Sequence, residues 1–131
     1  MLRSSGRSDT MPGSASQRRG SWAEQRALRL LQQAGWDLLA RQWRCRWGEI
    51  DLLLHKPQRL LLVEVKSRSR CGRDGWGLAG LNGAKRRRLV SAYGCWLAGH
   101  PQHQHCSVDL VLALVPLPPA RAPVRWIRWE V

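Results

Sequence analysis

Phenylalanine is absent from this chain of 131 residues, asparagine occurs once, and only three of the 22 basic residues are lysine. GC-rich coding also produces a skew toward arginine, so the arginine surplus alone does not establish phosphate binding. The scarcity of lysine makes each lysine informative, because the sequence uses arginine almost everywhere else. Two of the three are Lys66 and Lys85.

Apolar runs of membrane-spanning length are also missing, as is the apolar stretch of a secretory signal. The four cysteines, Cys45, Cys71, Cys95 and Cys106, form no CxxC pair. We therefore expect reduced thiols in a cytoplasmic protein without a membrane span. The segment 100–106 has zinc-ligand residue types but no second ligand pair at finger spacing, which favours a polar loop over a zinc site.

Acidic residues are few, and the formal net charge is +13. Such a surplus attracts polyanions, of which nucleic acid is the usual cytoplasmic example. The length suffices for a single domain with one core. Residues 1–17 show no apolar periodicity and are expected to form a flexible basic tail, which leaves residues 18–131 as the folded domain.

Two apolar runs of strand length, at 48–54 and 60–66, are separated by turn-forming residues around Pro57 and Gln58. This pattern predicts a β-hairpin that is buried on at least one face. Charged residues lie inside both runs, where an ionised group is unfavourable unless something compensates its charge.

The register of this hairpin predicts which charged side chains meet. A tight turn places Asp51 opposite Glu64 and Glu49 opposite Lys66, and strand alternation puts Asp51, Glu49 and Leu53 on one face. Two carboxylates about 5 Å apart repel unless one is protonated or a divalent cation lies between them. Oxygen ligands favour Mg²⁺ or Mn²⁺. The alternative is a solvated polar face on which Glu49 and Lys66 form an ion pair.

An amphipathic helix is expected from Ser21 to Ala34, ahead of the hairpin. Two interpretations of Glu24 remain open. With Ser21 as N-cap, Glu24 completes a capping box. With Leu28 and Leu31, it continues the apolar stripe of the helix toward the core.

Basic residues gather on three segments around the predicted carboxylates. The strand expected at 36–46 carries Arg44 near its end, and Arg68 follows the second arm of the hairpin. A second helix, expected at 82–98, opens with four consecutive cations that include Lys85 and Arg88, and these oppose the helix dipole. Contact with phosphates would explain why these basic residues gather around the carboxylates. For any single arginine, a solvated position at a strand end is the alternative.

Further strands are expected at 107–115 and 124–129. The glycine-rich segment 69–80 is expected to form a mobile lip over the site, with Trp76 as its anchor. The order helix, strand, hairpin, helix, strand predicts an α/β sandwich: a mixed sheet of about five strands flanked by helices.

The motif formed by Asp51 and Glu64-Val65-Lys66 resembles the metal-binding half of the restriction-endonuclease-like nucleases, in which an Asp precedes Glu-x-Lys. The flanking residues, Gly48-Glu49-Ile50-Asp51-Leu52 and Val63-Glu64-Val65-Lys66-Ser67-Arg68, resemble the bacterial YraN family. Those small proteins are similar in fold to archaeal Holliday junction resolvases. The resemblance covers residues 17–130 and implies a single-domain restriction-endonuclease-like sandwich. Two of the departures are Ala23 and Gln42, which stand where the family has Gly and Asn.

This resemblance implies a metal site for one or two Mg²⁺ or Mn²⁺ ions. Its expected ligands are Asp51, Glu64 and the carbonyl of Val65, with Glu24 as a further ligand. Lys66 would orient the attacking water and stabilise charge on the phosphate.

The implied activity is hydrolysis of phosphodiester bonds by a divalent-metal-dependent endonuclease, selective for branched DNA. Lys85 and Arg88 match basic positions of the family, and with Arg44 and Arg68 they are expected to contact the substrate backbone. DNA is favoured over RNA as the partner. A non-catalytic nucleic-acid-binding module of the same fold is the alternative, and both a monomer and a homodimer remain open.

Overall fold

The computed structural model describes residues 15–68 and 83–129. They form α1 (Ala15–Gln33), β1 (Asp37–Cys45), β2 (Gly48–Lys56), β3 (Arg59–Arg68), α2 (Gly83–Ala98), the short 3₁₀ helix η3 (Pro101–His103), β4 (Ser107–Pro116) and β5 (Arg125–Trp129). Residues 1–14 of the expected tail, and the expected lip with Trp76, lie outside the described residues. No helix in the described part of the chain is long and apolar enough to cross a membrane.

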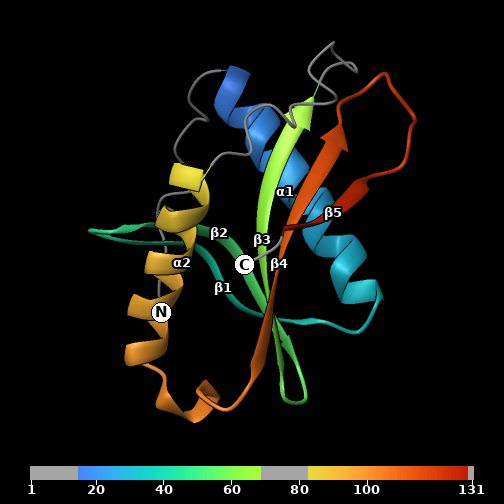
Figure 1. Cartoon of the computed structure of the whole chain (residues 1–131). Coiled ribbons are helices and arrows are strands. Elements are labelled where there is room, and N and C mark those ends of the chain that lie inside the picture. The colour runs from blue at the N-terminus through green and yellow to red at the C-terminus, as the bar shows by residue number, and fades with distance from the viewer. Residues whose placement is uncertain (1–14, 69–82, 130–131) are drawn as a thin grey trace, which may run out of the picture.

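The five strands form one mixed sheet in the order β1-β2-β3-β4-β5, in which only β3 and β4 are parallel. The two helices lie on opposite faces of this sheet (Figure 1). One buried layer joins α1 to the sheet through residues at helical spacing, Ala23, Ala27, Leu28 and Leu31. The other joins α2 to the sheet through Leu89, Ala92 and Trp96. The architecture confirms the predicted α/β sandwich with a five-stranded mixed sheet.

Helix α1 begins at Ala15, six residues before the expected start at Ser21. The capping-box interpretation of Ser21 and Glu24 is therefore wrong, because Ser21 lies inside the helix. Residues 17–19, Gln-Arg-Arg, are good helix formers that extend the helix beyond the apolar stripe. Glu24 is buried with only 7% of its surface exposed, as the alternative stripe interpretation requires.

The predicted hairpin register is correct from Lys56–Arg59 up to Leu52–Val63, where the β2–β3 ladder ends. The expected pairs Asp51–Glu64 and Glu49–Lys66 are not part of it. The alternation of side chains also breaks here, because Ile50 packs on the α2 face whereas Leu52 packs on the α1 face. The face of the sheet to which Asp51 and Glu49 point therefore cannot be deduced from Leu53 by counting every second residue.

A two-residue turn, Arg46-Trp47, connects β1 to β2, and Gly48 follows it where the chain meets α2. A Cβ atom at Gly48 would lie 2.6 Å from the backbone oxygen of Arg88, a contact that no side chain tolerates. The close approach of this turn to α2 therefore depends on glycine.

Replacing Gly48 with alanine should destabilise the fold by about 1–3 kcal/mol, the usual effect of overpacking, because the turn or α2 must shift. The free energy of unfolding in urea measures this change. Gly94→Ala is the matched control, because Gly94 lies in α2 with no atom within 4 Å of its Cβ position. It should be neutral or stabilising by about 0.5–1 kcal/mol. Equal effects of the two substitutions would contradict the steric argument.

Candidate functional site

Asp51 is an acidic side chain buried where β2 and β3 separate, with 9% of its surface exposed. Its Oδ2 accepts a hydrogen bond of 2.9 Å from the backbone N–H of Val65. Its Oδ1 accepts a longer one, 3.2 Å, from the side-chain amide of Gln42. The carboxylate thus joins the two strands just beyond the end of their backbone ladder.

Glu24 approaches the same region from α1 and is held by two neighbours. Arg41 Nε lies 2.8 Å from its Oε1, and the amide of Gln42 donates to its Oε2. The Gln42 Nε2 group therefore donates to Glu24 and to Asp51 together. Gln42 has a backbone φ of 51°, in the left-handed region that few side chains adopt.

Glu64 and Lys66 follow Leu62 along the face of β3 that α2 covers. Lys66 Nζ lies 3.8 Å from Glu64 Oε2, and Lys85 Nζ of α2 lies 3.7 Å from the same oxygen. Two of the three lysines in the chain thus converge on one carboxylate.

Burial is the largest influence on the protonation of these groups. The pKa of Asp51 is raised from its ordinary 3.8 to about 7, first by burial and then by the charge of Glu64, although the hydrogen bond from the Val65 N–H lowers it. Burial also raises the pKa of Glu64, against the opposing effects of Lys85 and Lys66. The pKa of Lys66 is lowered, first by burial and then by Lys85. The two acids therefore resist carrying negative charge together.

Divalent cations suit this pair of carboxylates, since a cation would add to the partial compensation that the lysines and hydrogen-bond donors supply. Over residues 15–68 and 83–129, no group of three or more His, Cys, Asp or Glu side chains is arranged to hold a metal. Mg²⁺ commonly takes one or two carboxylates and completes its shell with water and substrate oxygens. The donor set of Asp51 and Glu64 fits that requirement.

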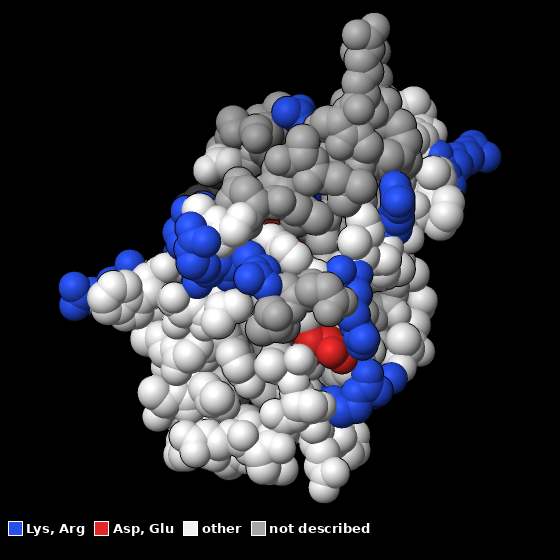
Figure 2. Space-filling view, in the orientation of Figure 1, with Lys and Arg blue, Asp and Glu red and all other residues white. Residues whose placement is uncertain are grey.

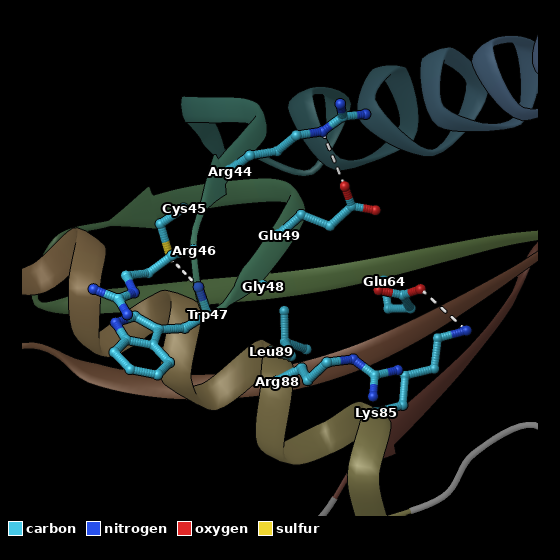
Figure 3. A pocket seen from close by; sticks show the side chains of 10 residues that line it. All are labelled: Arg44, Cys45, Arg46, Trp47, Gly48, Glu49, Glu64, Lys85, Arg88 and Leu89. Carbon is cyan, nitrogen blue, oxygen red and sulfur yellow. Dashed lines mark hydrogen bonds and ion pairs between the residues drawn. The ribbon is translucent and has the colours of Figure 1, made fainter.

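A cavity of about 410 Å³ lies between the β1–β2 turn and the first turns of α2 (Figure 3). Its lining includes three of the predicted phosphate-binding residues, Arg44, Lys85 and Arg88, together with Glu64. Arg68 is not in the lining; its guanidinium donates to the Ser67 carbonyl at the end of β3. The predicted phosphate contacts thus divide into three residues around the cavity and one outside it.

Glu49 forms an ion pair of 2.9 Å with Arg44 on the neighbouring strand β1. The expected pairing of Glu49 with Lys66 is therefore wrong. The register of β1 on β2 explains it, because Arg44 lies directly opposite Glu49. On the face seen in Figure 2, Lys and Arg side chains cover far more surface than Asp and Glu.

The histidine-containing segment packs as an ordinary loop. The His100 ring stacks on Trp96 with a centroid distance of 4.1 Å, and its Nδ1 lies 2.7 Å from the Trp96 carbonyl oxygen. This arrangement agrees with the polar-loop interpretation of residues 100–106.

Two residues of this region are not predicted by the sequence patterns. Gln42 differs from a family position, and nothing in the sequence indicates that its amide reaches two carboxylates. Trp47 has a signal in the sequence, because an aromatic residue occupies a tight turn where Gly, Asn or Asp is usual.

Comparison with known protein families identifies the family of this chain. The model of the uncharacterised protein family UPF0102 matches residues 23–113. The chain belongs to the UPF0102 family. This membership confirms the YraN-like resemblance of the motifs around Asp51 and Glu64.

Similar UPF0102 proteins cover most of the chain. One from Prochlorococcus marinus (strain MIT 9303) is 57% identical over 113 residues, which cover 86% of this chain and 90% of that protein. Another, from strain MIT 9313, is 54% identical and covers 83% of this chain and 86% of its own length. A UPF0102 protein of Pseudomonas putida (strain GB-1) is 38% identical, with coverages of 90% and 96%.

The raised pKa of Asp51 makes stability depend on pH. Below 3.8 the carboxyl is protonated in both states, whereas between 3.8 and about 7 only the unfolded chain ionises, so the folded state loses stability as the pH rises. Asp51→Asn cannot ionise. In EDTA the stability of the variant relative to wild type should therefore rise, by on the order of a few kcal/mol, between pH 3.8 and about 7. The amide also has one acceptor where the carboxyl uses two, a loss that is the same at every pH.

Thermal unfolding of wild type and variant across this pH range tests the linkage. Asp37→Asn, at the exposed start of β1, controls for the loss of one negative charge. A stabilisation of the Asp51 variant that is the same at every pH, or that the Asp37 variant shares, would contradict the buried-carboxyl explanation.

Proposed function

We propose that this UPF0102 protein is a nucleic-acid-binding, divalent-metal-dependent endonuclease that hydrolyses phosphodiester bonds, with branched DNA as the expected substrate. The observation that supports this most directly is the burial of Asp51 and Glu64 with raised pKa values, beside the ammonium group of Lys66. Buried acids with perturbed pKa values, next to a cation, are typical of catalytic sites.

Asp51 and Glu64 would hold Mg²⁺ or Mn²⁺, with the Val65 carbonyl as the expected third protein ligand. A bound divalent cation at such a site lowers the pKa of water and neutralises charge on a phosphoryl oxygen. Glu24 is engaged by Arg41 and Gln42 in this structure, so its proposed role is to hold the Gln42 amide against Asp51.

Lys66 supplies a positive charge 3.8 Å from Glu64 Oε2. Burial lowers the pKa of its ammonium group, so it gives up a proton more readily than an ordinary lysine does. In its charged form it stabilises the negative charge that develops on the scissile phosphate. Arg44, Lys85 and Arg88 around the cavity would position the backbone on either side of that phosphate.

A non-catalytic nucleic-acid-binding module is the second candidate function, and one observation favours it. Glu64 already has two ammonium partners and Asp51 already accepts two hydrogen bonds, so both acids are partly satisfied by the chain itself. The basic cavity would then bind phosphates, and the carboxylates would only fix the strands and α2.

Purified wild-type protein should cleave branched, single-stranded or duplex DNA when Mg²⁺ or Mn²⁺ is added, and should not cleave in EDTA. Asp51→Ala and Glu64→Ala should each slow cleavage at least about 100-fold, because each removes an expected ligand of the metal ion that would neutralise charge at the reacting phosphate. Gel resolution of labelled fragments measures the rates.

Binding to uncleaved DNA should persist in both variants and weaken steeply as salt rises, because phosphate contacts release counterions. Asp37→Ala, an exposed acid at the far end of β1, is the control and should cleave like wild type. Salt-sensitive binding without cleavage by wild type would favour the non-catalytic module. Undiminished cleavage by both alanine variants at the site would refute the proposed active site.

A further inference from the structure

Trp47 is the most exposed of the large hydrophobic side chains in the described part of the chain, with 55% of its surface open to solvent. It occupies the second position of the two-residue turn between β1 and β2, and its ring belongs to neither hydrophobic core. The exposed part of this ring leaves apolar surface that a ligand can cover.

The backbone beneath this ring is fixed. The Trp47 N–H lies 3.4 Å from Cys45 Sγ, and the next residue, Gly48, is pressed against the Arg88 carbonyl of α2. Trp47 is therefore an exposed ring on a rigid turn, which can accept a flat ligand with little loss of conformational entropy.

The ring also lies beside a cation and lines the cavity that reaches Glu64. The Arg46 guanidinium stands over the Trp47 ring, 4.7 Å from its centroid. Both residues line the cavity that contains Glu64, Lys85 and Arg88, and Figure 3 shows the ring at the end of this cavity away from Glu64. A strand whose phosphates pass Arg88 and Lys85 toward Glu64 would carry one of its bases to the ring.

We propose that Trp47 and Arg46 form a stacking subsite for one unpaired nucleobase at the end of the cavity away from Glu64. Trp rings stack on any base, and a guanidinium over the ring adds a cation–π contact. In a continuous duplex both faces of each base are covered by its neighbours, so the subsite selects strands with a base outside the stack. The preferred substrates are then single strands, flaps, loops and junctions.

The subsite deepens the proposed function and rests on its nucleic-acid-binding part. Charge favours a nucleic acid over a protein partner on this surface. Four cations line the cavity, Arg44, Arg46, Lys85 and Arg88, against two acids, Glu49 and Glu64. A polyanion with flat apolar groups matches this combination of charge and an exposed ring.

The test is binding in EDTA of a fluorescein-labelled single strand of mixed sequence and of its blunt duplex, followed by fluorescence anisotropy. Trp47→Ala should weaken binding of the single strand about 5- to 100-fold, the scale of losing one stacked base, and binding of the duplex less than about 2-fold. Trp47→Phe should restore most of the lost affinity.

Trp22→Ala is the matched control. Trp22 is also exposed, at 41%, and also has an arginine, Arg26, over its ring at 5.8 Å, but it lies on α1 and does not line this cavity. Its replacement should leave binding of both probes unchanged. Circular dichroism checks that each variant is folded.

Several outcomes would overturn the subsite: equal loss on both probes, no loss with Trp47→Ala, an equal loss with Trp22→Ala, or no binding of either probe by wild type. A change of oligomeric state with Trp47→Ala and unaltered strand binding would assign the ring to self-association instead.

If wild type never cleaves DNA but the Trp47 effect on single strands persists, the subsite stands and the endonuclease activity fails. If wild type cleaves and the Trp47 effect is missing, only the subsite fails.

Discussion

Desolvation of two carboxylates, buried Asp51 and partly buried Glu64, is the constraint on which the rest of this site depends. Asp51 and Glu64 lie at the end of the β2–β3 ladder, where low polarity makes negative charge unfavourable and raises both pKa values. Hydrogen-bond donors and lysines around the two carboxylates reduce that unfavourable energy. The Val65 N–H and the Gln42 amide donate to Asp51, while Lys66 and Lys85 approach Glu64.

The groups that offset the negative charge of the carboxylates lie on both faces of the sheet. On the α1 side, Arg41 and Gln42 neutralise and hold Glu24. On the α2 side, the lysines share Glu64 within the basic cavity. Asp51 is common to both groups, since Gln42 links it to Glu24 and its pKa responds to Glu64. Disturbing either helix would therefore change the energy of the same carboxyl.

The β1–β2 turn positions α2 beside the cavity. Gly48 lets the turn approach the backbone of α2, and that approach sets the position of the helix whose first turns carry Lys85 and Arg88. Trp47 and Arg46 extend from the same turn. One close backbone contact thus fixes the relative positions of the lysine beside Glu64 and the exposed aromatic ring.

Local sequence patterns alone determined much of the hairpin that carries this site. Apolar periodicity and the turn at Pro57 and Gln58 specified the hairpin and five of its register pairs, because strand alternation and turn geometry act over neighbouring residues. The tertiary structure decided where that ladder ends, that Glu24 is buried against Arg41 rather than capping a helix, and that Glu49 pairs with Arg44. These choices depend on desolvation and on side chains from segments far apart in the chain, which no local pattern encodes.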